Sequence, residues 1–385
     1  MKVLHLIQKP QLRGAEVFAS QLSTHLEEAG HQAILVSVFA GPAALPFGGK
    51  VYALNASQSH RFTDVKAWKK LAAIIESEKP DVIQANAGDT LKYAAFSKLL
   101  FGWKQPVIFR NASMISLYIK SKLIRLFNAF LFSKVELVIS VSNSSAEDFV
   151  KLFPALKNHI ITIPVGIEVN EAVATGKNTI PTLQGNPKLI HVGGFSFEKN
   201  HAGLLSVFER IIKKMPGALL HLVGDGPLKQ QTQSLVEQKG LKKQVVFHGY
   251  QKQPLSFIRQ ADALLLPSII EGLPGVVLEA FYCKTPVIAY DTGGIGEVVI
   301  NNKTGYLIPK QNEVAFADAV ESALNNSEEI NRFIANAYQL VTTQYMNDDI
   351  AVKFVKAYQT ITNKQAFSTN KVLQPTKNVI QNDYI

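Results

Sequence analysis

The 385-residue sequence contains one cysteine, Cys283, and no apolar run long enough to cross a bilayer. A single cysteine excludes an intramolecular disulfide, which favours a reducing compartment. The first apolar run, VLHLI, is too short for the core of a signal peptide. We therefore expect a cytoplasmic protein that is soluble or peripheral at the inner face of the membrane.

Several patterns of metal-binding or catalytic residues are also missing. Cys and His nowhere have the spacing of a zinc site, and the sequence lacks both G-x-x-x-x-G-K-[ST] and G-x-S-x-G. It contains no D-x-D, so nothing indicates a metal ion clamped on a diphosphate. We expect no metal and no permanently bound cofactor.

Acidic residues are absent from the segment 90–135, although the whole chain has a formal net charge of +10. Such positive charge favours an anionic ligand, an anionic membrane surface or nucleic acid. No nucleic-acid-binding module is recognisable here, so we expect no nucleic-acid partner. The basic residues of this segment are Lys92, Lys98, Lys104, Arg110, Lys120, Lys122, Arg125 and Lys134.

The first half of the chain alternates apolar stretches with amphipathic ones. Apolar runs rich in Val, Ile and Leu predict strands of a parallel sheet covered on both faces. Gly30 is expected to end the first helix in a left-handed conformation. The predicted strands are 2–7, 32–39, 81–86, 106–111 and 135–142, and the predicted helices are 14–30, 64–80 and 114–134.

The pattern breaks over 163–187, whose later part we read as a linker, and then restarts. Two successive units predict an α/β fold of two Rossmann-like, doubly wound domains that face each other across an interdomain cleft. We assign 1–168, with roughly 347–385 packing back, to the first domain and 169–346 to the second. The chain beyond about Asn363 is expected to be loose. The later strands are predicted at 188–195, 218–226, 245–250, 263–268 and 286–291, and the later helices at 201–215, 227–240, 254–260 and 275–283.

The stretch HVGGFSFEKN, residues 191–200, ends a strand in Gly193 and Gly194 and delivers Lys199 just before a helix. Glycines allow the backbone to approach a ligand, and a lysine neutralises phosphate. An ordinary turn with a solvated lysine explains the stretch equally well. Later glycine turns at 223–227 and 291–299 also follow predicted strands, but the first is not a dinucleotide fingerprint because Lys229 replaces its third glycine.

The stretch SIIEGLPGVVLEA, residues 268–280, places Glu271 in a loop and Glu279 inside the following helix. Pro274 suits the first turn of that helix. The amides of Gly275, Val276 and Val277 are then expected to be free for an anion such as a diphosphate. The two carboxylates can accept hydrogen bonds from sugar or ribose hydroxyls. The alternative is a glutamate at a helix start and another paired with a lysine.

Together these stretches resemble the donor-binding domain of the family 4 (group 1) retaining glycosyltransferases, which have the GT-B fold. The resemblance rests on VGGFSFEKN, LVGDGP, VVFHGY, ADALLLPSIIEGLPGVVLEA, TPVIAYDTGGIGEVV and TGYLIP, in the family's order across residues 191–309. Glu271 and Glu279 form the family's E-x7-E motif. The first half matches through RGAE, KPDVIQAN and VELVISVSNSSAEDF.

The resemblance implies a hexosyltransferase that uses a nucleotide diphosphate sugar, such as a UDP- or GDP-sugar, without a metal. Lys199 would bind the donor phosphates, Glu279 the ribose hydroxyls and Glu271 the donor sugar. Residues near Tyr250 would line the base pocket, and Gly14 would face the diphosphate from the first domain. The backbone that would approach sugar and diphosphate belongs to Gly193, Gly194, Gly272, Leu273, Pro274, Gly275 and Val276.

The chain departs from the family at a few positions. Gly194 stands where many members have an arginine, and Gln84 and Asn86 stand in a strand where many have histidines. We expect Arg110 or Asn111 to make the catalytic contact from the first domain. Arg110 would stabilise the negative charge that develops on the leaving diphosphate. Because no carboxylate pair for a nucleophile is evident, we expect front-face attack by the acceptor hydroxyl.

The acceptor is expected to be a saccharide or a lipid-linked molecule, in polysaccharide or glycolipid synthesis at the cell surface. The predicted helix 114–134 carries Lys120, Lys122 and Arg125 among apolar residues. It either lies on an anionic membrane or packs in the core with a solvated basic face. Two other functions remain open: a nucleotide-sugar epimerase of the same architecture, and a non-catalytic protein that binds sugar nucleotides.

Overall fold

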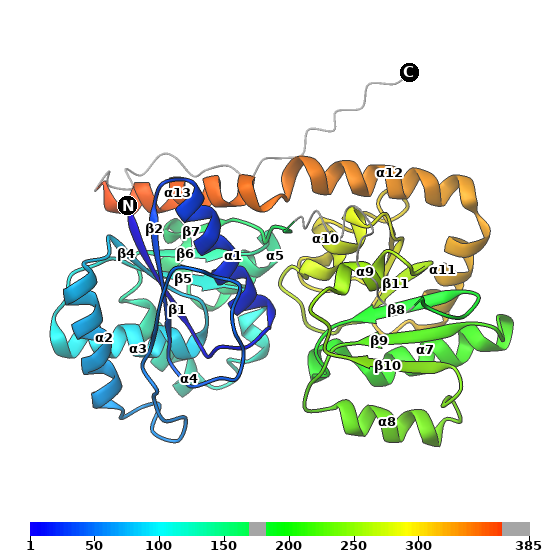
Figure 1. The fold of residues 1–385 in the computed structure, drawn as a ribbon, viewed down its shortest axis with the longest axis horizontal. Coiled ribbons are helices and arrows are strands. Elements are labelled where there is room, and N and C mark those ends of the chain that lie inside the picture. The colour runs from blue at the N-terminus through cyan, green and yellow to red at the C-terminus, as the bar shows by residue number, and fades with distance from the viewer. Residues whose placement is uncertain (169–181, 364–385) are drawn as a thin grey trace. The chain divides into compact units, whose positions relative to one another are not determined.

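The structure is a computed structural model that describes residues 1–168 and 182–363. Residues 169–181 of the predicted linker and the predicted loose tail from residue 364 lie outside this range. The chain divides into two compact units, Met1–Ile163 with the residues from Ala351, and Pro164–Ile350 (Figure 1). Within the described residues, no helix has both the length and the apolar composition needed to span a bilayer.

The first unit is built on a parallel sheet with the strand order β3-β2-β1-β4-β5-β6-β7 among the described residues. The chain adds strands on one side of β1 and then continues from β4 on the other side. The topological switch point therefore lies between β1 and β4. The strands are β1 (Lys2–Ile7), β2 (Gln32–Ser37), β3 (Lys50–Ala53), β4 (Val82–Ala85), β5 (Val107–Asn111), β6 (Leu137–Ser140) and β7 (Ile160–Thr162).

Helices cover both faces of this sheet because alternate strand residues point to opposite sides. On one face Phe18 of α1 contacts Phe354 of α13, with ring centroids 5.5 Å apart. On the other, Trp68 of α2 stacks on Phe96 of α3 at 5.0 Å. The helices are α1 (Gly14–Glu28), α2 (Val65–Glu78), α3 (Gly88–Phe101), α4 (Lys122–Phe132), α5 (Asn143–Leu152) and α13 (Asn347–Thr362), of which α13 belongs to this unit from Ala351.

The helix predicted over 114–134 is wrong in its first half. A 3-10 turn, η1 (Ile115–Leu117), comes first, and α4 begins only at Lys122. Ser121 caps α4 by accepting a hydrogen bond of 3.1 Å from the backbone N–H of Ile124. The N–H of Ser116 is held by Asp148 of α5 at 3.0 Å, which fixes the turn before the helix. Apolar periodicity alone did not reveal this break.

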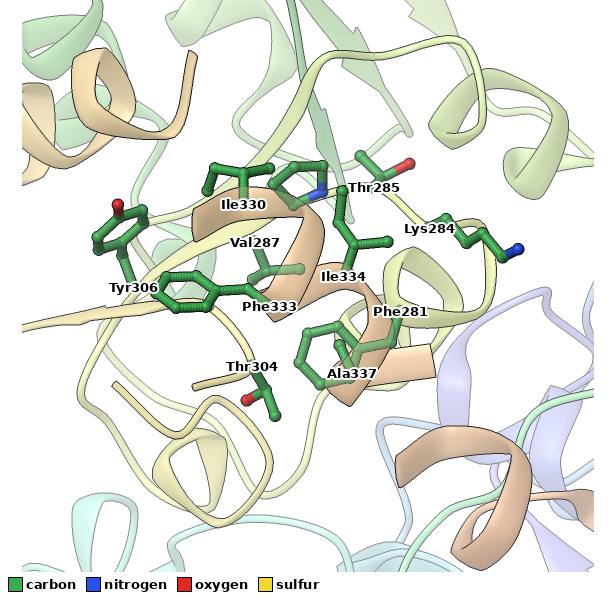
Figure 2. A pocket seen from close by; sticks show the side chains of 12 residues that line it. Phe281, Lys284, Thr285, Val287, Thr304, Tyr306, Ile330, Phe333, Ile334 and Ala337 are labelled. Atoms are coloured by element: carbon green, nitrogen blue, oxygen red, sulfur yellow. The ribbon is translucent and has the colours of Figure 1, made fainter. Parts of the chain in front are cut away.

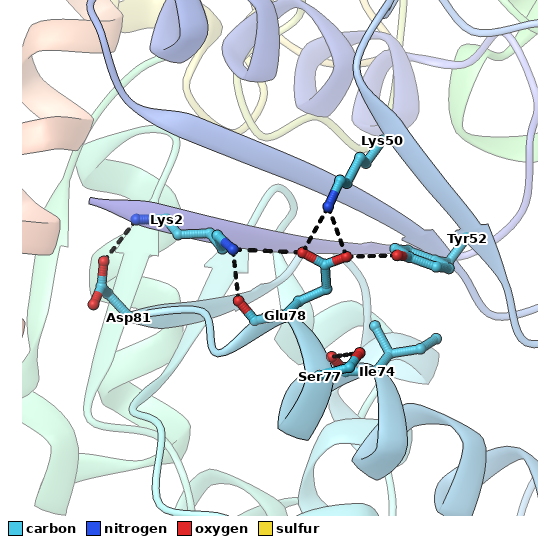
Figure 3. Close-up of polar contacts among 7 residues, drawn as sticks. All are labelled: Lys2, Lys50, Tyr52, Ile74, Ser77, Glu78 and Asp81. Carbon is cyan, nitrogen blue, oxygen red and sulfur yellow. Dashed lines mark hydrogen bonds and ion pairs between the residues drawn. The ribbon is translucent and has the colours of Figure 1, made fainter.

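A polar cluster ties the end of α2 to the sheet (Figure 3). The carboxylate of Glu78 accepts hydrogen bonds from Tyr52 Oη at 2.5 Å and from Lys50 Nζ at 3.0 Å. It also pairs with Lys2 Nζ at 3.4 Å. These bonds, led by the one from Tyr52, lower the pKa of Glu78 to about 2. Glu78 thus links α2 with β1 and β3.

The second unit contains a parallel sheet with the order β10-β9-β8-β11-β12-β13 among the described residues. Here the switch point lies between the neighbours β8 and β11. Its strands are β8 (Lys188–Val192), β9 (Leu219–Val223), β10 (Val245–Gly249), β11 (Ala263–Leu266), β12 (Val287–Tyr290) and β13 (Tyr306–Ile308). Its helices are α7 (His201–Lys214), α8 (Lys229–Gln238), α9 (Pro254–Ile258), α10 (Gly275–Tyr282), α11 (Glu313–Asn325) and α12 (Ser327–Gln344).

A small cavity of about 10 Å³ lies between α10, α12 and the strand β13. Figure 2 shows side chains from these elements around it, among them Phe281, Ile330 and Phe333. Its volume is that of roughly one water molecule. None of the predicted site residues lines it. We interpret the cavity as a packing defect of the core and not as a ligand site.

Candidate donor site

Lys199 and Glu271 meet at the switch point of the second sheet. Lys199 ends the 3-10 turn η3 (Phe197–Lys199) that follows β8, and Glu271 lies in the loop that follows β11. Lys199 Nζ lies 2.6 Å from Glu271 Oε1, and the two side chains are 20% and 11% exposed. The carboxyl ends of the two strands on either side of a switch point are where such sheets bind ligands. A cation and a carboxylate, both within reach of solvent, therefore occupy this position.

Two glycines near this pair lie so close to neighbouring backbone that no larger residue would fit at either position. At Gly224, with φ +141°, a Cβ atom would lie 2.0 Å from the carbonyl oxygen of Gly193. At Gly293, with φ +55°, it would lie 1.8 Å from the carbonyl oxygen of Glu271. The amide of Gly294 donates to Gly272 O at 2.7 Å. The loops after β8, β9, β11 and β12 thus hold one another, and they fix the backbone that carries Glu271.

The start of α10 lies directly after this loop. Pro274 is the N-cap, with φ −77° and ψ 120°, so it precedes the first turn that the sequence assigned to it. The amide of Val277 donates to Pro274 O at 3.2 Å, which corrects the expectation that it is free. Gly275 and Val276 supply the first two amides of the helix. Their N–H groups carry the positive end of the helix dipole.

Glu279 belongs to α10 and interacts electrostatically with Lys199. Burial raises the pKa of Glu279 to about 7, and the positive charge of Lys199 opposes this rise. No described residue donates a hydrogen bond to its carboxylate. Both oxygens of an ionised carboxylate are hydrogen-bond acceptors, so those of Glu279 have unused acceptor capacity. Glu271 is thus paired with Lys199, and Glu279 lies close enough to the same lysine for its charge to affect the pKa of the carboxylate.

Two buried histidines beneath Lys199 were not identified in the sequence. His191 Nδ1 lies 2.8 Å from Leu265 O, so this nitrogen carries the proton and Nε2 is an acceptor. The ring of His201 stacks on Phe195 at 4.1 Å and meets His191 edge-on at 4.8 Å. Burial lowers the pKa of His191 to about 4 and that of His201 to about 2. Both are neutral at pH 7, which leaves Lys199 as the cation of this cluster.

Tyr250 follows β10, two strands away from β8. Its side chain is partly exposed, and partial burial raises its pKa. The amide of Gly224 donates to Gly249 O at 2.8 Å, which joins this strand end to the glycine turn after β9. Tyr250 thus lies at the same carboxyl edge of the sheet as Lys199, but no contact joins it to the Lys199–Glu271 pair.

The predicted residues of the first unit lie in a different environment. Gly14 begins α1 with no atom within 4 Å of a Cβ position, so the backbone there is open. Arg110 is only 3% exposed, and its guanidinium carbon lies 4.0 Å from the ring centroid of Phe18. Its Nε and Nη1 have no hydrogen-bond partner. Burial lowers the pKa of Arg110 to about 10, while Tyr358 and Glu16 raise it.

Asn111 and the residues that replace the family's histidines are tied into the buried interior. Asn111 Nδ2 donates to Ser140 Oγ and to Ser145 O, both at 3.1 Å. Gln84 accepts a hydrogen bond of 2.7 Å from Tyr358 of α13 and donates one of 2.9 Å to Asn86. The structure therefore places Arg110 under α1 and gives Asn111 two hydrogen bonds of its own.

Similarity to known proteins extends over nearly the whole chain. Residues 12–171 match the family described as Glycosyltransferase Family 4, and residues 175–340 match Glycosyl transferases group 1. The chain belongs to this family of glycosyltransferases, as the sequence motifs predicted. Within the described residues, no group of three or more His, Cys, Asp or Glu side chains is arranged to hold a metal ion.

Individual relatives are distant. The chain is 27% identical over 222 residues to the 2-deoxystreptamine N-acetyl-D-glucosaminyltransferase of Streptomyces fradiae, covering 55% of this chain and 53% of the relative. It is 24% identical over 373 residues to the glycogen synthase of Mycobacterium tuberculosis, covering 88% of each. The matches to the first curated relatives span only 43% to 53% of their length.

Solved structures confirm the GT-B fold with its two Rossmann-like domains. Sucrose-phosphate synthase from Thermosynechococcus elongatus aligns with a TM-score of 0.79 at 19% identity, covering 94% of this chain and 98% of that one. HepE from Anabaena, in complex with UDP and glucose, aligns with a TM-score of 0.78 at 17% identity, covering 93% of this chain and 99% of HepE. At this identity the likeness defines the fold alone.

Proposed function

We propose that the protein transfers a hexose from a nucleotide diphosphate sugar to a hydroxyl of a saccharide or lipid-linked acceptor, with retention of anomeric configuration. The Lys199–Glu271 pair at the β8/β11 switch point carries this proposal, because it offers a cation for phosphate and a carboxylate for sugar hydroxyls 2.6 Å apart. The S. fradiae relative, a glucosaminyltransferase by name, supports sugar transfer, and the UDP-bound structure of HepE supports the donor class.

In the proposed complex, the donor diphosphate lies between Lys199 and the first amides of α10, at Gly275 and Val276. Glu279 accepts hydrogen bonds from the ribose and Glu271 from the transferred sugar. Leu273 and Pro274 shape the loop, Gly193 and Gly194 allow close approach, and the base lies near Tyr250. No metal takes part: Lys199 and the helix start supply the positive charge that the diphosphate needs.

The reaction breaks the bond between the anomeric carbon and the diphosphate, and it forms a bond from that carbon to the acceptor oxygen. In front-face attack the acceptor proton moves to the departing phosphate oxygen. Lys199 stabilises the charge that develops there. We assign the same role to Arg110, with Asn111 holding the neighbouring strand end, and we place Gly14 beside the diphosphate. Trapping of a covalent glycosyl-enzyme would contradict this route.

We assign residues 1–168, with 347–385, to the acceptor side and 169–346 to the donor side. The proposed enzyme is cytoplasmic and peripheral at the inner face of the membrane, in synthesis of cell-surface polysaccharide or glycolipid. The exposed apolar side chains of α4 support the membrane contact.

A panel of UDP- and GDP-sugars with simple sugar acceptors tests the proposal. Release of nucleoside diphosphate together with a product of retained configuration supports transfer. Conversion of the nucleotide sugar into its epimer would instead support an epimerase. Tight binding of sugar nucleotides with no turnover for any donor would support a non-catalytic binding protein.

A further inference from the structure

We propose that helix α4 is a docking surface for an anionic lipid bilayer. Such docking would bring the enzyme to a lipid-linked acceptor, and this role rests on the proposed function. The surface itself is argued from exposed apolar side chains and unpaired charges in the first unit. We call it the α4 face, and it consists of Leu123, Ile124, Leu126 and Phe130.

The α4 face points away from the core. Leu123 is 79% exposed and Leu126 is 67% exposed, which is unusual for leucines in a folded domain. Ile124 and Phe130 are also exposed. Residues three, four and seven positions apart lie on one side of a helix, so Leu123, Leu126 and Phe130 form a continuous apolar stripe. Such a stripe on a monomer marks a contact with another apolar phase.

Other residues of α4 hold the helix on the domain. Leu131 and Phe132 are buried at its end. The ring of Phe127 lies 6.3 Å from that of Phe96 in α3 and 5.9 Å from that of Phe62. These contacts anchor the helix without Leu123 and Leu126, which stay exposed. The neighbouring helix α3 also ends on exposed apolar residues, which are Leu99, Leu100 and Phe101.

The charges around the α4 face select an anionic partner. Two acidic residues of this unit, Glu136 and Asp89, are already paired with lysines: Lys98 lies 2.9 Å from Glu136 and Lys92 lies 2.7 Å from Asp89. Basic residues without an ion pair in the described structure are Lys104, Lys120, Lys122, Arg125 and Lys134. A second copy of this chain would bring the same positive charge to the contact, whereas anionic headgroups complement it. An apolar stripe bordered by lysine and arginine is typical of helices that lie in a membrane interface.

The α4 face is connected to the carboxyl edge of the first sheet. Phe62, which contacts Phe127, has Arg61 5.4 Å and Lys92 4.9 Å from its ring centroid. Lys92 pairs with Asp89, which in turn accepts a hydrogen bond of 2.9 Å from Gln8. Gln8 and Asp89 follow β1 and β4, the two strands at the switch point. Phe62, Lys92 and Asp89 thus form a chain of contacts between α4 and the carboxyl edge of the first sheet.

Flotation of the full chain with lipid vesicles tests the proposal. We expect binding to vesicles that contain about one third phosphatidylglycerol, little binding to pure phosphatidylcholine, and loss of binding at high salt. The variant L123E/L126E is expected to bind at least about tenfold more weakly. Its matched control, V314E/V352E, changes two exposed valines on other helices and should stay within about twofold of the wild type.

Charge is tested separately. K122Q/R125Q should weaken vesicle binding about tenfold, while K213Q/K243Q, on the second unit, should not change it. Equal binding to neutral vesicles, or no flotation even at low salt, would overturn the proposal. So would a wild-type dimer that L123E/L126E converts to monomer, because a second copy would then cover the face. Turnover of a soluble acceptor is measured in parallel. If the enzyme turns over the soluble acceptor but does not float with vesicles, the docking proposal is wrong and the proposed transfer stands. If the enzyme floats but shows no turnover, the proposed transfer is wrong and the docking proposal stands.

Discussion

Lys199 Nζ and Glu271 Oε1 lie 2.6 Å apart, although the two residues are 72 positions apart in the chain. The two strand ends that carry them, after β8 and β11, are adjacent at the switch point. In this state the lysine is paired with a carboxylate where the proposed donor would place a diphosphate. Since an ammonium group has three donors, it can keep Glu271 in place while it also binds phosphate.

Replacement of Glu271 by glutamine or alanine should reduce transfer at least about a hundredfold, because the proposed contact with the reacting sugar is lost. Binding of the nucleoside diphosphate should change by less than about threefold, since Lys199 and the helix start remain. Product formation and calorimetric titration measure the two effects. E328Q, at an exposed position on α12, is the control. Full activity of E271A would refute the assigned role.

Replacement of Lys199 by alanine should weaken nucleoside diphosphate binding by about tenfold or more and remove much of its salt dependence. The neutral histidines nearby cannot compensate, because burial keeps the pKa of His191 at about 4. Titration at two salt concentrations measures this. The control is K213A, an exposed lysine on α7. If K199A binds the nucleotide as the wild type does, the phosphate site lies elsewhere.

The affinity for the nucleotide should rise with pH through neutrality. Burial raises the pKa of Glu279 from 4.5 to about 7, and only the ionised form offers both oxygens as acceptors to ribose. Below pH 6 we expect the affinity to fall by up to about tenfold per pH unit. E279Q should bind more weakly and with a flat pH profile. An unchanged pH dependence in E279Q would assign the titration to another group.

Glu279 also affects stability. Because its pKa is raised on folding, its favourable contribution is complete below pH 4.5 and is lost as the pH rises through about 7. E279Q should therefore unfold at a higher temperature than the wild type at pH 8, and the difference should shrink toward pH 5. Thermal unfolding at several pH values measures it. A larger gain at pH 5 than at pH 8 would contradict the raised pKa.

A variant of Arg110 can distinguish a catalytic role of this residue from a structural one. Its Nε and Nη1 lack hydrogen-bond partners, and burial of a charge without such partners is unfavourable to folding. R110M should therefore melt within a few degrees of the wild type but lose about tenfold or more in kcat, with KM for the donor nearly unchanged. Unfolding of R110M, with normal kcat in the folded fraction, would make Arg110 a structural residue.

The cluster around Glu78 should make the first unit sensitive to acid. Its pKa is lowered to about 2, so its contribution is present above pH 4.5 and is lost as the pH falls toward 2. E78Q should cost about 1–2 kcal/mol at pH 7 because charge-assisted bonds to Tyr52, Lys50 and Lys2 are weakened. Urea unfolding measures this loss. The difference from the wild type should vanish near pH 2, and a constant difference would exclude the ionised carboxylate as its source.

Sequence patterns identified most of the second unit because its strands are continuous apolar runs and its glycine turns follow them directly. They missed short or edge elements such as β3 (Lys50–Ala53) and β7 (Ile160–Thr162), where few residues carry the pattern. They also missed α3 (Gly88–Phe101), whose apolar residues do not fall on one face. The break before α4 depends on the cap at Ser121 and on a contact with Asp148 of α5, and periodicity contains neither.

The sequence by itself determined the family, the two Rossmann-like units and the residues of the donor motif, because each depends on local runs and spacings. Only the tertiary structure decided which side chains meet. It paired Lys199 with Glu271, buried His191 and His201 beneath them, and enclosed Arg110 against Phe18. It also turned Leu123 and Leu126 toward solvent. Burial and pKa depend on neighbours distant in the chain, and these neighbours are set only when the sheets and helices pack.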